Sequence, residues 1–277
     1  MRIVLTGAGG IVGGAVARVL AGAGHAITPL GRATGWQLGQ DADLAGHAAL
    51  IHCAFAHAPG RYRGGEGDDP AGFLAANLDG TRRLFDAAWR DRVGRVVFLS
   101  SRAVHDGHAP GLTLTDALPP APTTLYGRVK AEAEAHLAAL PLCGTSLRAT
   151  GVYGPGAANK WRGLFADFRA GRPIAPRIAT EVHADDLAHA LRLLLDLPAP
   201  PVTANCSDLV LDRHDLLAAV AERTGCRHPL PARADRAALR VPDCAALCAA
   251  GWQPRGWPGL RLALPALLSD RAPAAGA

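Results

Sequence analysis

The chain has 277 residues, of which 49% are hydrophobic and 19% are charged, and its formal net charge at pH 7 is +5. This composition is typical of a folded globular protein with a sizeable core, and it excludes a disordered chain. The basic residues are scattered arginines rather than a stripe with interleaved aromatics, so we expect no nucleic-acid partner and favour a small, anionic substrate or cofactor.

The sequence has no signal-peptide pattern and no apolar stretch long enough to cross a membrane, so we expect a cytoplasmic protein with no membrane partner. Its six cysteines form no CxxC pair, and Cys244 and Cys248 lack partners for a zinc site. We therefore expect buried, reduced thiols and no bound metal.

Residues 2–7, RIVLTG, are a short apolar run of the kind that forms a central parallel strand. The run leads into Gly7, Gly10 and Gly13, spaced as TGxxGxxG, and then into an amphipathic stretch that predicts a helix. Glycines here allow a tight turn, close approach of a pyrophosphate and close packing of helix on strand. The free N–H groups and dipole of the helix start attract phosphate. With a second strand predicted over 25–32, the pattern favours a dinucleotide site over a purely structural glycine-rich turn.

The end of that second strand carries Arg32, and the next carboxylate along the chain is Asp41. A carboxylate at this point hydrogen-bonds both ribose hydroxyls of NAD, whereas an arginine accommodates the 2′-phosphate of NADP. The sequence therefore favours NADP over NAD, although a solvated surface arginine would give the same pattern.

Strands and helices continue to alternate along the chain. Further strands are predicted at 35–39, 48–55, 94–101 and 144–154, and long helices at 68–92 and 123–140. Asp69 and Pro70 supply N-cap and first-turn signals for the first of these helices. Such alternation predicts a doubly wound parallel sheet, which binds its ligand at the carboxyl ends of the strands. Ser100, Ser101 and the start of the 123–140 helix should lie there.

Only two of the 29 basic residues are lysines, and one of them, Lys130, follows Tyr126 by four positions. On a helix this offset places both side chains on one face. A phenol is a useful acid or base for interconverting an alcohol and a ketone, and a nearby ammonium lowers its pKa from about 10 towards neutrality. An ammonium can also hydrogen-bond the hydroxyls of a ribose, for which a guanidinium fork is less suited. The pair therefore predicts a catalytic site.

Three motifs in this order, TGxxGxxG at 6–13, the serine that ends VVFLSS and YxxxK at 126–130, resemble the extended short-chain dehydrogenase/reductase superfamily, in its NAD(P)-dependent epimerase/dehydratase branch. Further matching stretches lie at 77–88, 147–155, 182–191 and 250–255. The resemblance implies a Rossmann-type doubly wound parallel sheet with a small C-terminal substrate lobe. It also implies a homodimer formed through the helices that carry Asn77 and Tyr126.

The resemblance implies roles for single residues. Ser101 would hydrogen-bond the reacting oxygen of the substrate, Tyr126 would be the general acid/base, and Lys130 would lower its pKa and bind ribose. Asn77 would be a further catalytic residue, although a helix asparagine can instead bond the helix backbone. Contacts with the dinucleotide are implied for Gly7, Gly10, Ile11, Val12, Gly13, Arg32, Gln37, Leu38, Cys53, Ala54, Phe55, Asn77, Leu99, Tyr126, Lys130, Thr150 and Val152. Gln37 replaces the family's usual aspartate, which weakens only the adenine contact.

Three other features have plain structural explanations. Asp185 and Asp186 are expected to cap a helix and complement its dipole rather than bind a metal. His52, in the middle of a predicted strand, is expected to be a core histidine. The glycine-rich, charged segment 61–70 would either gate the site or be a solvated loop.

The resemblance and proline-rich breaks such as LPAPPV divide the chain into two parts. Residues 1–152 with 181–198 would form the dinucleotide-binding domain, and 153–180 with 199–277 the small substrate-binding lobe. The first insert of the lobe carries four arginines that could meet an anionic substrate or lie on the surface: Arg162, Arg169, Arg172 and Arg177.

The implied function is NAD(P)-dependent hydride transfer between a nicotinamide cofactor and a secondary alcohol or ketone of a sugar or nucleotide-sugar-like substrate. The first alternative is an NAD-dependent sugar epimerase, which performs the same chemistry twice on tightly held NAD. A 4,6-dehydratase is disfavoured because Arg102 and Ala103 follow Ser101 where those enzymes have Asp-Glu. A non-catalytic NADP-sensing protein is the second alternative, disfavoured by the intact Tyr126–Lys130 pair.

Overall fold

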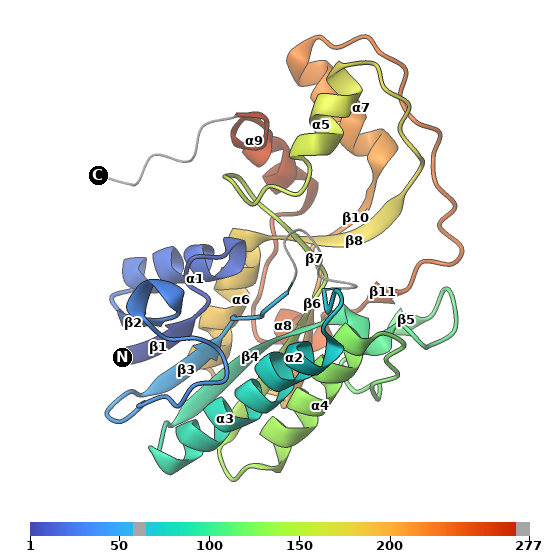
Figure 1. The fold of residues 1–277 in the computed structure, drawn as a ribbon. Coiled ribbons are helices and arrows are strands. Elements are labelled where there is room, and N and C mark those ends of the chain that lie inside the picture. Colours follow the sequence, from blue (N-terminus) through green and yellow to red (C-terminus); the bar gives the residue numbers. More distant parts are fainter. Residues whose placement is uncertain (58–64, 270–277) are drawn as a thin grey trace.

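A computed structural model describes residues 1–57 and 65–269 (Figure 1). Its main sheet has six parallel strands in the order β2-β1-β3-β4-β6-β9. These strands are β1 (Arg2–Thr6), β2 (Ala26–Leu30), β3 (Ala49–His52), β4 (Arg95–Ser101), β6 (Cys143–Ala149) and β9 (Thr203–Cys206). The chain leaves β1 towards β2 and returns on its other side through β3, so the sheet has its switch point between β1 and β3. The predicted Rossmann-type sheet is confirmed.

The position of each strand in the sheet follows from its side chains. β3 is buried along its whole length, and β1 is buried except for Arg2, as expected of inner parallel strands covered on both faces. β2 is more exposed and lies at the edge of the sheet. Pro29 lacks an N–H, which is tolerated in an edge strand because its open side has no neighbouring strand to bond.

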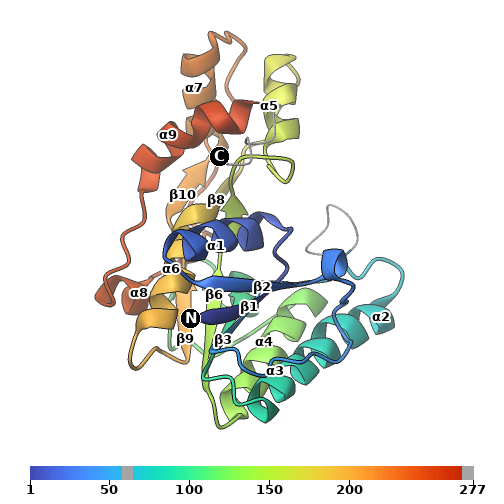
Figure 2. The same cartoon turned by 90° about the vertical axis from the view of Figure 1, so that its left-hand side faces the viewer.

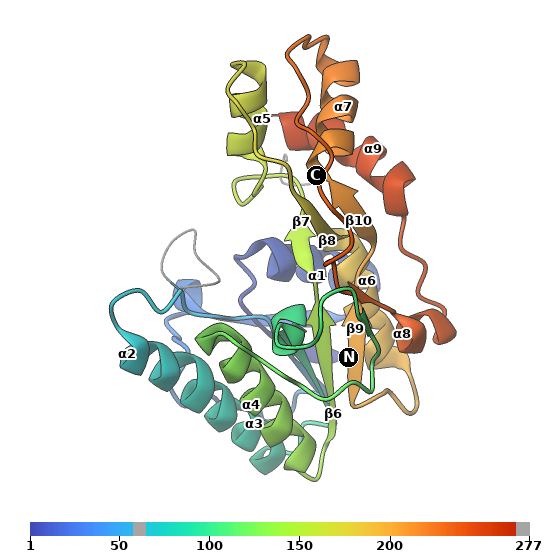
Figure 3. The ribbon, with the colours of Figure 1, turned by 90° about the vertical axis from the view of Figure 1, so that its right-hand side faces the viewer.

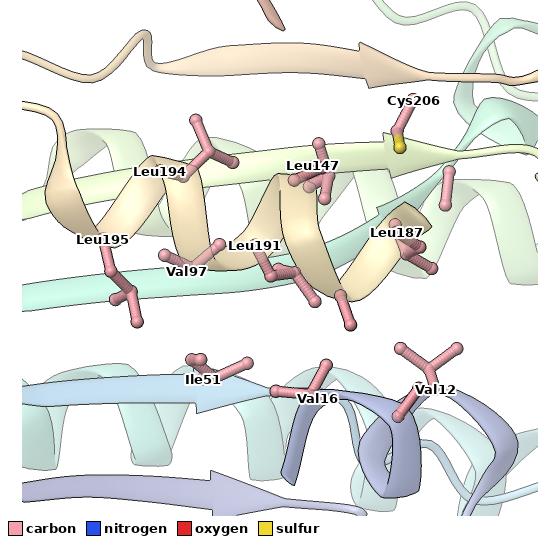
Figure 4. Close-up of a cluster of buried hydrophobic side chains, with 14 of the residues drawn as sticks. Val12, Val16, Ile51, Val97, Leu147, Leu187, Leu191, Leu194, Leu195 and Cys206 are labelled. Atoms are coloured by element: carbon pink, nitrogen blue, oxygen red, sulfur yellow. The ribbon is translucent and has the colours of Figure 1, made fainter. Parts of the chain in front are cut away.

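Helices cover both faces of the main sheet. α1 (Ile11–Gly22) and α6 (Ala184–Asp196) pack side by side on one face, and Figure 4 shows side chains of α6 beside Val97 and Leu147 of the strands. α3 (Gly80–Arg90) and α4 (Leu125–Ala139) cover the other face, as Figure 3 shows. The helix that follows the glycine turn, α1, and the helix that carries Tyr126, α4, therefore lie on opposite faces of one sheet.

The predicted helix over 68–92 is present but not uniform. It comprises α2 (Pro70–Leu74), a π-helical turn (Ala75–Asp79) and α3. Asp69 is the N-cap, whose side chain accepts a hydrogen bond from the Gly72 N–H at 2.8 Å, and Pro70 opens the first turn, as predicted.

A smaller lobe begins where β6 ends (Figure 2). It contains a three-stranded sheet in the order β10-β8-β7 and three helices that share a separate apolar core. Its elements are β7 (Gly151–Tyr153), α5 (Arg162–Arg169), β8 (Ile178–His183), β10 (Leu209–Asp212), α7 (Arg213–Thr224) and α9 (Gly256–Leu268). Two short strands, β5 (Thr113–Leu114) and β11 (Val241–Pro242), pair with each other, and α8 (Ala245–Ala249) follows.

Two predicted strands differ from the structure. Residues 35–39 form turns rather than a strand, because Gly35 and Gly39 adopt positive φ angles of 78° and 103°. The stretch 144–154 is two strands, β6 and β7, which belong to different sheets and are separated by Thr150.

The predicted boundary of the small lobe is wrong at its second segment. The prediction assigned all of 199–277 to the lobe, yet β9 is the sixth strand of the main sheet, where Ala204 and Cys206 are fully buried. α8 also belongs with the main domain, since Leu247 packs into the core between the sheet and helices α1 and α6. The proline-rich stretch before β9 predicts a boundary, but it is a loop within the main domain.

Candidate active site

The glycine turn after β1 has no room for side chains. Gly7 has a φ of 72°, and a Cβ there would lie 2.8 Å from the backbone nitrogen of Ala54. A Cβ at Gly13 would overlap the carbonyl oxygen of Gly7. α1 starts behind this turn with Gly10 as its N-cap, with no side-chain cap and no acidic residue in its first turn. The first N–H groups of α1 are thus available to an anion, which is the requirement for holding a pyrophosphate.

Thr6 fixes the chain after β3 against this turn. Its Oγ1 accepts hydrogen bonds from the backbone N–H groups of Cys53 and Ala54, both at 3.1 Å, and contacts Nδ1 of His52 at 2.7 Å. The predicted contacts Cys53, Ala54 and Phe55 are thereby brought beside the glycine turn.

Tyr126 and Lys130 meet at one aromatic ring. α4 begins with Thr124 as its N-cap, so Tyr126 lies in the first turn and Lys130 one turn later. The ring of Tyr126 packs edge-on against the ring of Phe55, with 5.1 Å between the two centroids. Nζ of Lys130 lies 4.5 Å from the centroid of the Phe55 ring. The Lys130 amine also donates a hydrogen bond to the carbonyl oxygen of Leu99 at 2.8 Å, at the carboxyl end of β4. The predicted pair therefore lies where β3 and β4 end.

Burial dominates the electrostatics of Lys130. The residue is only 4% exposed, and its amine lies over the rings of Phe55 and Phe98, at 4.5 and 4.6 Å. Desolvation lowers the pKa of the Lys130 amine to about 7, against the opposite effects of Cys53 and Glu134. Burial also raises the pKa of the Cys53 thiol to about 12, so this thiol stays protonated at neutral pH.

This pKa makes stability depend on pH. Because the amine of Lys130 has a pKa of about 7 in the fold and an ordinary pKa of 10.5, the unfolded chain binds more protons between these two values. Stability should therefore rise with pH across this window, with a slope approaching about 1.4 kcal/mol per pH unit. Denaturant unfolding of the wild type and of Lys130→Met between pH 7 and 10 measures the effect. The unfolding free energy of the wild type should rise with pH relative to that of Lys130→Met. If the two unfolding free energies had the same pH dependence, the lowered pKa of Lys130 would be contradicted.

Ser101 lies next to the start of α4. It is the N-cap of the 3₁₀ turn Arg102–His105, and its Oγ accepts a hydrogen bond from the N–H of Ala103 at 3.2 Å. This turn packs against α4 so closely that a Cβ at Gly127 would lie 2.6 Å from the carbonyl oxygen of Ala103. The elements that carry Ser101 and Tyr126 are thus in direct contact.

Asn77 is buried and bonded to two backbone segments. Its side-chain amide donates to the carbonyl oxygens of Ala56 and Phe73, at 2.7 and 3.0 Å, and accepts from the Ala56 N–H at 2.7 Å. Both amide hydrogens are therefore bonded to backbone carbonyl oxygens, and the catalytic role of Asn77 stays a prediction. Asn77 positions the segment that carries Phe55, and its bond to Phe73 is the bond that a helix asparagine can form with the helix backbone.

The remaining predicted contacts lie at the edges of the same region. Thr150 is buried, and its hydroxyl is directed towards the carbonyl oxygen of Cys206 at 3.4 Å. Val152 is half-buried in β7 and packs on the core that includes α1. Arg32 and Gln37 are exposed beyond the end of β2, and Arg32 forms no ion pair with any described residue. Leu38 is half-buried.

The expectations for other features have mixed outcomes. His52 is a core histidine, 1% exposed between Thr6 and Thr81, and burial followed by the effect of Lys130 lowers its pKa to about 3. The cap of α6 is His183, not Asp185 or Asp186 as predicted. Both aspartates do lie in the first turn of α6, where they complement its dipole. In the segment 61–70, residues 61–64 lie outside the described residues, and gating by it stays a prediction.

A family model described as NAD dependent epimerase/dehydratase family matches residues 3–205. The chain belongs to this family. The match covers the glycine turn, the Tyr126–Lys130 helix and the strands between them. A comparison with curated proteins finds no significant match.

Solved structures of similar fold extend over nearly the whole chain. MoeE5 in complex with UDP-glucuronic acid and NAD is 24% identical over 96% of this chain and 97% of that chain, with a TM-score of 0.76. UDP-glucose 4-epimerase from Thermus thermophilus in complex with NAD is 23% identical over 98% and 100%, with a TM-score of 0.77. TunA, an NAD dependent NDP-hexosamine 5,6-dehydratase involved in tunicamycin biosynthesis, is 20% identical over 98% and 99%, with a TM-score of 0.78. At these identities the likeness establishes a shared fold.

A buried polar network behind the family's Tyr-Lys pair was missed by the sequence analysis. Glu134 follows Lys130 by one helical turn and is 5% exposed. It accepts hydrogen bonds from the Ser100 hydroxyl and from the Arg148 guanidinium, whose Nη2 lies 2.8 Å from Oε2. Nη1 of Arg148 lies 3.2 Å from Nε2 of His105. This network ties α4 to the carboxyl ends of β4 and β6. The sequence signals were a glutamate on the Tyr-Lys face and an arginine inside an apolar strand.

Among the described residues, no group of three or more potential ligands is placed to hold a metal ion. None of the described helices has the length and apolar character needed to span a bilayer.

Proposed function

We propose that this protein is an NADP-dependent oxidoreductase that transfers hydride between the nicotinamide and a secondary alcohol or ketone of a sugar or nucleotide-sugar-like substrate. The observation that carries this proposal is the meeting of Tyr126 and Lys130 at the ring of Phe55, beside the glycine turn. Membership of the NAD dependent epimerase/dehydratase family supports it.

The residues around the glycine turn fit a dinucleotide. Gly7 and Gly13 leave a surface of bare backbone that any Cβ would fill, and the uncapped start of α1 presents N–H groups to the phosphates. The Lys130 amine, which uses one donor on Leu99, keeps two donors for the hydroxyls of a ribose. When bound, a nicotinamide accepts or donates hydride at its C4.

The protein groups would handle the proton. The Tyr126 hydroxyl is proposed as general acid towards a ketone and general base towards an alcohol, since the Lys130 cation favours the phenolate. The hydroxyl of Ser101 would donate to the reacting oxygen and orient it. Ser101 is well placed for this role because the turn that it caps packs on the first turn of α4.

The substrate class rests on charge and on the related structures. Arg177 and Arg213 line a small pocket in the lobe with Trp161 and Glu181, and two guanidinium groups to one carboxylate favour a substrate that carries an anionic group. Of the four arginines singled out in the sequence, Arg177 is the one in this pocket. The structure of MoeE5 contains UDP-glucuronic acid, which is such a molecule. The proposed enzyme is a homodimer formed through α3 and α4, and the 53% exposure of Trp89 on α3 supports this surface.

A sugar epimerase is the second candidate, favoured by the family match and by the likeness to the epimerase from Thermus thermophilus. The two candidates differ in how they hold the dinucleotide. In the first sample, purified protein is denatured and the released dinucleotide is identified. A second sample is incubated with an excess of labelled NADP before it is denatured, so that exchange of the bound dinucleotide can be measured. We expect rapid exchange and a preference for NADP. Tightly held NAD that does not exchange would establish the epimerase, and absence of any dinucleotide binding would overturn both.

The preference for NADP depends on Arg32. Arg32→Asp should weaken NADP binding by about 10- to 100-fold, because the 2′-phosphate loses a cation and gains a repelling carboxylate. NAD binding should be unchanged or tighter, and serves as the internal control. Isothermal titration calorimetry with both dinucleotides measures the two affinities. Equal affinities for NAD and NADP in the wild type would contradict this role of Arg32.

A further inference from the structure

Lys160, the second of the two lysines, occupies a fixed position between β7 and α5. Its neighbours Asn159 and Trp161 are 8% and 7% exposed. The Asn159 side chain donates to the carbonyl oxygen of Leu267 at 2.8 Å and accepts from the Trp161 N–H at 3.0 Å. The backbone on both sides of Lys160 is therefore anchored in the core of the small lobe.

The Lys160 amine forms a close ion pair with Glu181 on β8. Lys160 keeps 33% of its side chain exposed, whereas Glu181 keeps 6%, so the carboxylate is the buried anchor and the amine is its accessible partner. The amine also lies 5.4 Å from the centroid of a Trp161 ring. These contacts hold the amine in one place and leave it open to solvent on one side.

The ion pair fills the space that a side chain at position 151 would take. A Cβ at Gly151 would lie 2.5 Å from Oε2 of Glu181 and 2.8 Å from Nζ of Lys160. Gly151 is exposed and follows Thr150, at the end of β6 and next to the residues expected beside the nicotinamide. The absence of a side chain there lets Lys160 lie close to the backbone just after β6.

The surroundings of the pair are positively charged. Lys160 and Arg177 both act on the Glu181 carboxylate, and Arg213 lines the same pocket as Arg177 and Glu181. Burial lowers the pKa of the Lys160 amine, and Arg177 lowers it further, whereas Glu181 acts in the opposite direction. An additional negative charge at this place would be attracted by Lys160, Arg177 and Arg213, against the repulsion of the Glu181 carboxylate.

Building on the proposed function, we propose that Lys160 is a specificity-determining residue that binds a negatively charged group, such as a carboxylate, at the reacting end of the substrate. Glu181 holds the amine at Gly151, and the ammonium retains donors for a charge-assisted bond. The enzyme should therefore prefer a sugar that carries an acidic group over its uncharged analogue.

The test compares UDP-glucuronic acid with UDP-glucose, which differ at the sugar by a carboxylate. Isothermal titration calorimetry on protein saturated with NADP gives both dissociation constants. The wild type should bind UDP-glucuronic acid about tenfold more tightly or better, and Lys160→Met should abolish that preference. Because this variant leaves Glu181 buried without its partner, Lys160→Met/Glu181→Gln is measured as well. Arg172→Met, which removes an exposed arginine paired with Asp167, is the matched control and should keep the preference.

The outcomes separate this inference from the proposed function. A loss of preference in both Lys160 variants but not in Arg172→Met supports the role of Lys160. If the Lys160 variants bind both UDP sugars more weakly by the same factor, or bind both as tightly as the wild type does, the role of Lys160 is overturned. Thermal-shift measurements with NADP and NAD on the same samples test the proposed function on its own, because no stabilisation by either dinucleotide would contradict that function whatever Lys160 does.

Discussion

Tyr126→Phe is expected to reduce kcat by about 10²- to 10⁴-fold, the usual contribution of a general acid/base. The substitution removes one oxygen and keeps the ring that packs edge-on against Phe55 at 5.1 Å, so the fold and the position of Lys130 should not change. Dinucleotide affinity should stay within about threefold of the wild type, because on the proposed function the phosphates would be held at the glycine turn and the ribose by Lys130.

The measurement uses a panel of nucleotide sugars and follows the absorbance of the reduced nicotinamide. Tyr153→Phe is the matched control: Tyr153 is fully buried in the small lobe and stacks on Trp161 with 4.7 Å between centroids. It should keep kcat within a few-fold of the wild type. Turnover by Tyr126→Phe at the wild-type rate would rule out Tyr126 as the group that moves the proton.

Gly13→Ala is expected to destroy dinucleotide binding and to destabilise the fold by about 1–3 kcal/mol or more. The added Cβ would overlap the Gly7 carbonyl oxygen, and since this atom is backbone, no side-chain rotation relieves the overlap. Either the turn or the start of α1 must shift, which displaces the N–H groups that would hold the phosphates.

Gly14 provides a control one residue away in the same helix. A Cβ at Gly14 would lie 3.6 Å from the nearest atom, an ordinary contact. Gly14→Ala should therefore keep dinucleotide affinity and raise the unfolding free energy by up to about 1 kcal/mol, from helix propensity. Denaturant unfolding and titration with NADP measure both effects. If the two variants behaved alike, the close approach of Gly13 to Gly7 would not matter for binding.

Local patterns allowed much of the fold and site to be predicted from the sequence. The glycine spacing and the Tyr-Lys offset are fixed by the geometry of a single turn or helix, and the structure has Gly7 with positive φ and Tyr126 and Lys130 at one ring. The parallel sheet follows from the alternation of its strands with helices.

Features that depend on distant pairing were missed or wrong. Nothing near Glu134 in the sequence indicates Arg148, which reaches it from a neighbouring strand to form a buried ion pair. The bonds between Asn77 and Ala56, 21 residues away, have no local sequence signal either. β9 follows a proline-rich loop that resembles a linker, and only its pairing with β6 assigns it to the main sheet.

A crystal structure with bound NADP tests the central claim most directly, because it locates the nicotinamide relative to the phenol and the amine. We predict that the Lys130 amine donates to a hydroxyl of the nicotinamide ribose at about 2.7–3.2 Å. The Tyr126 hydroxyl should face the nicotinamide ring, and the pyrophosphate should lie at the start of α1. A dinucleotide bound away from the glycine turn, or a nicotinamide that neither side chain faces, would contradict the account.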